Sequence, residues 1–168
     1  MNAREIHDQI KEKFPEAILE FNDTVQQPYL KIAPQPFYNV CQFLRDDADL
    51  DFDYLMCLSG VDYGDLLGTV YHFYSMKHAH KIILKVEVPR ENPAIPSICD
   101  LWRTADWHER EVYDLFGIVF LNHPDLRRLL LPEDWEGYPL RKDYVTPEFF
   151  KGIPVLHSEM KSETNEQK

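Results

Sequence analysis

Two long β-rich runs separated by only four residues constrain the fold of this chain most strongly. The runs cover residues 69–76 and 81–88, and the polar stretch 77–80 lies between them. So short a connection joins antiparallel neighbours, because a parallel pair needs a crossover of a dozen residues or more. In the second run apolar residues alternate with Lys85 and Glu87. This alternation predicts a hairpin in a sheet that has one solvated face.

Further strands and helices are predicted before this hairpin. Residues 17–21 and 29–33 are β-rich runs that can pair with each other. The run 54–58 is apolar throughout, which predicts a strand buried on both faces. Apolar residues recur at helical spacing within 2–14 and within 37–44. We therefore expect two amphipathic helices and three strands in the N-terminal half.

Three pairs of residues with the spacing of a capping box predict helix starts. They are Asn2 with Glu5, Ser97 with Asp100, and Asp106 with Glu109. The second pair predicts a short helix ending near Arg103, and the third a helix running to Phe116 with Gly117 as its stop. Three prolines between residues 89 and 96 predict a loop. Residues 118–120 are expected to add a short strand.

These elements indicate an α+β fold with a mixed or antiparallel sheet of about four to five strands and helices packed on it. We expect a globular domain over 1–120, an extended partner-binding arm over 121–145, and a polar, flexible tail over 146–168. The last dozen residues, from His157, are expected to be disordered. No apolar run reaches the ~18 residues of a membrane span, and the N-terminus resembles no signal sequence. A cytoplasmic protein, attached to a membrane only through partners, is predicted.

Charge and cysteine usage exclude several classes of function. There are 18 basic and 29 acidic side chains, a net charge of −11, which argues against nucleic-acid binding. The cysteines Cys41, Cys57 and Cys99 are far apart and are interpreted as core residues. Three thiols do not supply the four thiolates of an iron–sulfur cluster. Local spacing gives no metal site, nicotinamide site or flavin site either.

The densest charged cluster lies on the predicted helix that ends at Phe116. Its members are Glu109, Arg110, Glu111 and Asp114. Arg110 and Asp114 are four residues apart and can pair on a helix, so we interpret the cluster as an internal ion network. An alternative is a small acid–base enzyme that uses His108 with Glu109 and Glu111.

The segment after this helix has an unusual composition. A helical turn is predicted over 123–131, and prolines interrupt the extended stretch 132–144, in which arginines and large aromatic residues mix. These residue types anchor protein interfaces. Composition alone leaves two interpretations open, a partner-binding arm or an arm packed on its own domain.

An ordered series of motifs in the same region resembles a known family. The motifs are Trp107, Glu109-Arg110-Glu111, Asp114-Leu115-Phe116-Gly117, His123-Pro124-Asp125-Leu126-Arg127-Arg128, Pro132-Glu133-Asp134-Trp135-Glu136-Gly137 and Pro139-Leu140-Arg141-Lys142-Asp143-Tyr144. Upstream, Val61-Asp62-Tyr63, Tyr71-His72, Val86-Glu87-Val88-Pro89 and Pro96-Ser97 add to the likeness. The chain thus resembles the 30 kDa family, also called the C subunit family, of respiratory complex I, the NADH:quinone oxidoreductase, over roughly residues 50 to 145.

The resemblance implies a non-catalytic structural and assembly component of the peripheral arm. FMN, iron–sulfur clusters and quinone would be held by the complex and not by this chain. The resemblance places the protein beside the D subunit, on the cytoplasmic side of the bacterial inner membrane. The residues expected at this interface are Arg127, Arg128, Arg141 and Lys142 as donors, and Trp135 and Tyr144 as aromatic anchors. The nearest alternative is the equivalent component of a membrane-bound hydrogenase or of a ferredoxin-driven complex.

Overall fold

The computed structural model describes residues 1–155, so the disorder predicted from His157 onward lies outside the described residues. Its centre is a five-stranded sheet with the order β1-β2-β5-β4-β3. The strands are β1 (Ile18–Asn22), β2 (Tyr29–Ile32), β3 (Tyr54–Asp62), β4 (Leu66–Ser75) and β5 (His80–Pro89). Neighbouring strands are antiparallel except β2 with β5, which are parallel. The predicted α+β fold with a mixed sheet is confirmed.

The hairpin predicted from the two β-rich runs forms the middle of this sheet. β4 and β5 pair without a break from Ser75 opposite His80 to Leu66 opposite Pro89. The pairing of β1 with β2 is also antiparallel, as predicted. The short connections between the paired runs therefore predicted both hairpins correctly.

Strand β3 corrects a prediction. It runs to Asp62 and lies at the edge of the sheet, where Tyr54 and Met56 are 45% and 49% exposed. Leu55 and Leu58 point to the core instead. The strand is therefore covered on one face only, and its run of apolar residues misled the sequence-based interpretation.

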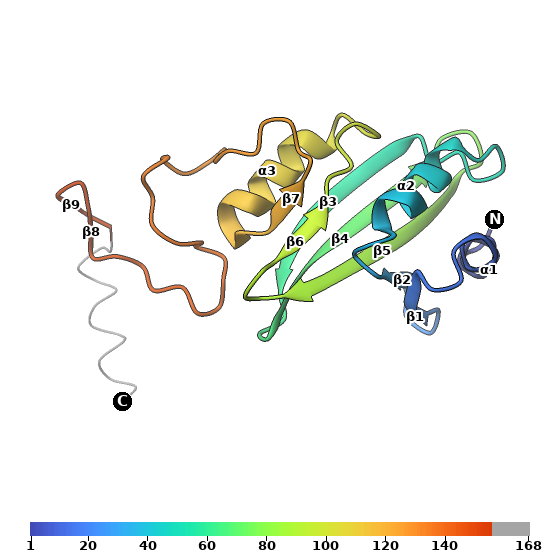
Figure 1. Ribbon diagram of the computed structural model, residues 1–168, viewed down its shortest axis with the longest axis horizontal. Coiled ribbons are helices and arrows are strands. Elements are labelled where there is room, and N and C mark those ends of the chain that lie inside the picture. Colours follow the sequence, from blue (N-terminus) through green and yellow to red (C-terminus); the bar gives the residue numbers. More distant parts are fainter. Residues whose placement is uncertain (156–168) are drawn as a thin grey trace.

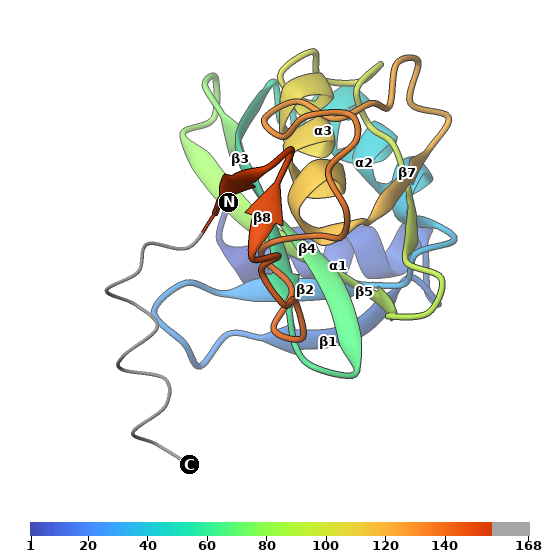
Figure 2. The ribbon, with the colours of Figure 1, turned by 90° about the vertical axis from the view of Figure 1, so that its left-hand side faces the viewer.

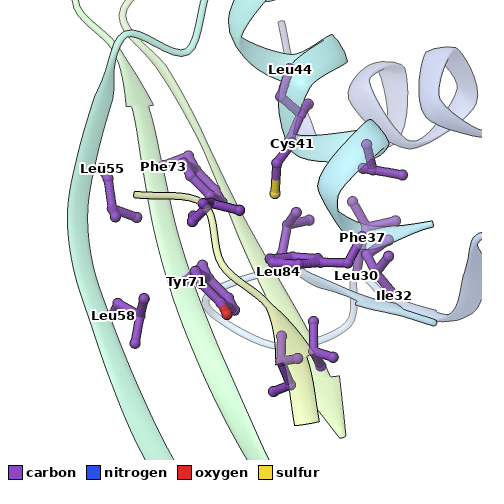
Figure 3. Packing of buried hydrophobic residues seen from close by; sticks show 14 of the residues in the cluster. Leu30, Ile32, Phe37, Cys41, Leu44, Leu55, Leu58, Tyr71, Phe73 and Leu84 are labelled. Carbon is purple, nitrogen blue, oxygen red and sulfur yellow. The ribbon is translucent and has the colours of Figure 1, made fainter. Parts of the chain in front are cut away.

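Within residues 1–155, three helices accompany the sheet: α1 (Ala3–Lys13), α2 (Phe37–Asp46) and α3 (Ala105–Phe116). The capping box of Asn2 and Glu5 at α1 is confirmed. α2 covers the sheet through Phe37, whose ring centroid lies 4.7 Å from that of Tyr71 in β4 (Figure 3). Apolar side chains from α2 and from the covered face of the sheet fill the core between them (Figure 3).

Helix α3 covers the same face of the sheet near the end of β3. A Cβ atom on Gly60 of β3 would lie 2.5 Å from the ring of Phe116, so the helix approaches the strand where no side chain intervenes. Gly117 ends α3 in the left-handed conformation, with φ of 71°, as predicted. The strand predicted over 118–120 is present as β7 (Val119–Leu121).

Two predictions near α3 are wrong. Residues 97–103 form turns and no helix, although the Ser97 hydroxyl accepts the Cys99 N–H at 3.3 Å while it donates to the Glu109 carboxylate. Glu109 is engaged in this bond, so it forms no capping box with Asp106. The predicted loop 89–96 ends in β6 (Ala94–Pro96), which pairs in parallel with β7.

The chain beyond β7 leaves the sheet as an arm without helix or strand until residue 149. The predicted helical turn over 123–131 is absent. A small hairpin of β8 (Phe149–Phe150) and β9 (Ile153–Pro154) follows, inside the segment expected to be a polar tail. The arm lies at the end of the molecule opposite α1 (Figure 1), and Figure 2 shows it passing in front of α3. None of the helices in residues 1–155 combines the length and the apolar character needed to cross a bilayer.

Candidate functional site

A buried carboxylate at the end of α3 holds the start of the arm. Asp114 is fully buried, and its Oδ2 accepts the backbone N–H groups of Leu129, Leu130 and Leu131 at 3.0, 2.7 and 2.9 Å. Its Oδ1 accepts a hydrogen bond from Arg128 at 2.7 Å. Burial opposes ionisation, but these donors outweigh it and lower the pKa of Asp114. Asp114 therefore acts as a fixed anion around which the arm turns.

Arg128 donates its hydrogen bonds to groups of its own chain. One guanidinium nitrogen donates to the Asp114 carboxylate and carbonyl, and the other to the carbonyls of Trp135 and Gly137 at 2.8 and 3.1 Å. The guanidinium also lies 5.5 Å from the ring centroid of Tyr138. The geometry thus assigns Arg128 to holding the path of the arm, where the sequence predicted a donor to a partner.

Arg141 makes a similar internal connection. Its Nε donates to the carbonyl of Phe116 at 2.6 Å, and its guanidinium lies 4.6 Å from the ring centroid of Tyr138. That ring covers Gly117, on which a Cβ atom would lie 2.5 Å from it. The glycine therefore serves two needs, a positive φ and the close approach of the arm.

A second carboxylate, Asp62 at the end of β3, holds the far part of the arm. It accepts from the backbone N–H of Lys142 at 2.8 Å, from that of Gly64 at 2.8 Å, and from Arg90 at 2.9 Å. Burial opposes ionisation, but these donors lower the pKa of Asp62 to about 2. Arg90 also pairs with Asp143 of the arm. No role was predicted for Asp62, Arg90 or Asp143, although Asp62 and Asp143 both stand in the resembling motifs.

The two predicted aromatic anchors contact each other. Nε1 of Trp135 donates to the hydroxyl of Tyr144 at 3.1 Å. The Trp135 ring also lies 4.9 Å from that of Phe150 in β8. Both predicted anchors are half-buried within the arm, so they give it shape and leave part of their surface accessible.

Apolar side chains on the arm face solvent. Leu130, Leu140 and Val145 are 62%, 53% and 84% exposed. Lys142 is exposed as well, and Arg127 is exposed and paired with Asp125 at 2.9 Å. We name this set the outer face of the arm: Leu130, Leu140, Lys142 and Val145. It combines apolar area with a positive charge, although the rest of the chain is strongly acidic.

The predicted ion network on α3 is arranged differently from the sequence-based expectation. Arg110 does not pair with Asp114, since Arg128 occupies that carboxylate, and Arg110 donates at 3.4 Å to carbonyls of the arm. Glu109 is fully buried, and burial raises its pKa to about 7. Glu111 is exposed. The carboxylates of the acid–base alternative therefore do not converge on one point, as general acid–base catalysis requires.

Comparison with known proteins assigns the chain to a family. Residues 30–150 match the model of the respiratory-chain NADH dehydrogenase 30 Kd subunit. The chain belongs to this family. A protein of Chloroherpeton thalassium, named as the C subunit of NADH-quinone oxidoreductase, is 50% identical over 149 residues, which are 87% of this chain and 62% of that protein. A protein of the same name from Chlorobium phaeobacteroides is 44% identical over 153 residues, 89% of this chain and 92% of that protein.

Solved structures agree with the family in fold. The trypsin-resistant fragment (1-134) of Nqo5 superposes with a TM-score of 0.62 at 26% identity, covering 75% of this chain and 100% of the fragment. A chain of the membrane-bound sulfane sulfur reductase, an archaeal respiratory membrane complex, gives a TM-score of 0.70 at 21% identity, covering 98% and 92%. At that identity the second likeness shows the fold alone.

Proposed function

We propose that this chain is a non-catalytic structural and assembly component in the peripheral arm of a proton-translocating NADH:quinone oxidoreductase. Relatives 44% and 50% identical are named as the C subunit of NADH-quinone oxidoreductase, which supports this proposal. The FMN, the iron–sulfur clusters and the quinone belong to other chains of the complex. The chain attaches to the cytoplasmic face of the inner membrane through those chains.

The outer face of the arm is the observation that carries the proposal. Large apolar side chains exposed on a segment that is clamped at both ends are typical of a docking surface. The internal bonds of Arg128 and Asp62 fix the backbone before a partner arrives, so little ordering entropy remains to be lost on binding. We assign the docking partner as the D subunit of the complex.

The predicted interface residues take two different roles in this proposal. Lys142 and Arg127 face solvent and donate to acidic groups of the D subunit. Trp135 and Tyr144 support the arm and contribute their accessible edges. Arg128 and Arg141 position the arm from inside. No residue of the chain is assigned to electron transfer.

Capture of the assembled complex tests this function. The tagged full chain is expressed in its own host, recovered from solubilised membranes, and its co-purifying proteins are identified by mass spectrometry. We expect the D subunit together with the flavin and iron–sulfur proteins, and NADH:quinone oxidoreductase activity in the eluate. Recovery with a nickel-bearing hydrogenase protein, or with ferredoxin-dependent activity, would replace this function with the related complex. A chain recovered alone would contradict a role within a complex.

A further inference from the structure

Three side chains far apart in the sequence meet beside a cavity at the root of the arm. One donor atom each of Cys99, Glu109 and His123 lies within 4.8 Å of the other two. Cys99 follows β6, Glu109 is on α3 and His123 follows β7. The parallel pair of β6 and β7, together with α3, brings the three side chains together. A cavity of about 830 Å³, lined in part by Cys99 and Asp106, opens onto this cluster.

The cluster contains two carboxyl groups that their neighbours pair only in part. The Glu109 side chain is fully buried, and its only ion-pair candidate among residues 1–155 is the His123 ring, with Nε2 at 3.9 Å. Asp106 Oδ1 lies 3.5 Å from the same Nε2 and is a buried oxygen without a hydrogen-bond partner within the described part of the chain. Burying an oxygen without a hydrogen-bond partner costs folding free energy unless a further group, such as a bound ion or a water molecule, interacts with that oxygen.

The donor set has the chemistry of a transition-metal site. A thiol, an imidazole and a carboxylate are the three ligand types that Zn²⁺ accepts, whereas Mg²⁺ prefers oxygen ligands. Cys41 and Cys57 have no such neighbours in the structure described, because Cys99, Glu109 and His123 are the only cluster of this kind there. We propose that Cys99, Glu109 and His123 bind a Zn²⁺-class divalent ion, with Asp106 or a water molecule from the cavity as fourth ligand.

Small movements complete this geometry. Ligand atoms around a tetrahedral zinc ion are about 3.5 Å apart, given metal–ligand bonds of about 2.0–2.3 Å. The present distances therefore require closure by about 1 Å. Glu109 already accepts from Ser97 and from the Ile98 N–H, at 2.5 and 2.8 Å, and these bonds orient its carboxylate as outer partners of metal ligands do.

His123 must change its hydrogen bonding on binding. Its Nδ1 accepts the backbone N–H of Asp125 at 3.1 Å, so Nε2 carries the proton in the neutral ring and donates to the Asp106 carbonyl at 3.3 Å. Coordination through Nε2 displaces this proton to Nδ1 and opens the contact with Asp125, which lies in an exposed turn. The ion then joins β6, α3 and the root of the arm, and it stabilises the folded chain through binding.

Cobalt substitution tests the site on the full-length chain. Purified protein freed of metal is titrated with Co²⁺, whose bond to a thiolate gives a charge-transfer absorption band in the near ultraviolet. We expect one equivalent of Co²⁺ to produce this band, one equivalent of Zn²⁺ to remove it and to raise Tm, and Mg²⁺ to do neither. Cys99→Ser abolishes the band, and His123→Gln lowers Zn²⁺ affinity by more than the ~10–100-fold typical of losing an outer partner.

Cys57→Ser is the matched control, because Cys57 is the other half-buried thiol and lies on β3, outside the cluster. It should leave the band and the affinity unchanged. Absence of the thiolate band in the wild-type chain, or its loss in Cys57→Ser with retention in Cys99→Ser, overturns the proposal. Because binding is measured on the chain itself, this result is independent of whether the proposed role in the complex holds.

Discussion

Asp114 connects one residue of α3 to four consecutive residues of the arm. Three backbone N–H groups and one guanidinium reach the same carboxylate, which burial removes from water. The sequence placed this residue in a charged cluster but paired it with Arg110, because helical spacing reveals only partners on the same helix. Its actual partner, Arg128, lies in the arm, outside that helix.

Replacement of Asp114 by Asn should destabilise the chain strongly. The variant leaves Arg128 without its counter-charge, and breaking a buried pair in this way costs about 3–5 kcal/mol. Urea unfolding of the isolated chain measures this loss. Asp125→Asn removes the exposed pair with Arg127 and should cost only about 0–1 kcal/mol. Equal losses in the two variants would refute the role of Asp114.

Gly117 offers a second test at the scale of one residue. Gly117→Ala places a Cβ at positive φ and within 2.5 Å of the Tyr138 ring, whereas Gly64→Ala meets only the strain, because nothing lies within 4 Å. Left-handed strain alone costs about 1–2 kcal/mol. We expect a greater loss of unfolding free energy in Gly117→Ala, and proteolytic cleavage of its arm at lower protease concentration. If Gly64→Ala loses as much unfolding free energy as Gly117→Ala, then a steric contact between residue 117 and the Tyr138 ring contributes nothing to the loss, which would contradict this account.

At the scale of elements, the sequence predicted the helices and hairpins that are determined by interactions between residues close together in the chain. Short connections predicted the hairpins β1–β2 and β4–β5, and apolar spacing predicted α1 and α2. The exposed side of β3 was missed because an edge strand with apolar residues on both faces has no alternation to read. The helix predicted over 97–103 was wrong: the segment forms turns, and the bond from Ser97 to Glu109 of α3 joins residues that local spacing does not connect.

The sequence predicted that an extended arm exists, but it did not predict which residues attach the arm to the rest of the chain. Proline and aromatic content indicated an extended segment, yet Asp62 and the Lys142 N–H are 80 residues apart. No periodicity links such positions. The same holds for Cys99, Glu109 and His123, whose proximity depends on the pairing of β6 with β7 and on the contact of α3 with β7.

The attachment of the arm to β3 should depend on pH. The pKa of Asp62 is lowered from 3.8 to about 2 in the folded chain. Its ionised form therefore stabilises the fold fully above about pH 4, and this contribution is lost as the pH falls toward 2, because the unfolded chain takes up the proton first. The difference in unfolding free energy between wild type and Asp62→Asn should shrink between about pH 4 and pH 2. A difference that stays constant over this range would contradict the assignment.

At the scale of the whole molecule, the two ends of the chain differ in character. The sheet, α1 and α2 enclose a buried apolar core, whereas the arm lies at the opposite end (Figure 1) and exposes large apolar side chains. This asymmetry fits the proposed function, in which the arm docks on another chain of the complex. It also explains why the charged groups of α3 hold the arm in place and do not converge on a catalytic centre.

The outer face of the arm is tested most directly by assembly of the complex with a variant chain. Leu140→Asp with Val145→Asp places two charges on this face, at exposed residues that donate no hydrogen bond to Asp114. Leu19→Asp is the control, since Leu19 is 61% exposed on β1, away from the arm. The quantity to measure is the amount of the D subunit recovered with each tagged chain from solubilised membranes. We expect recovery with wild type and Leu19→Asp and its loss with the double variant, whereas undiminished recovery with the double variant would contradict docking through the arm.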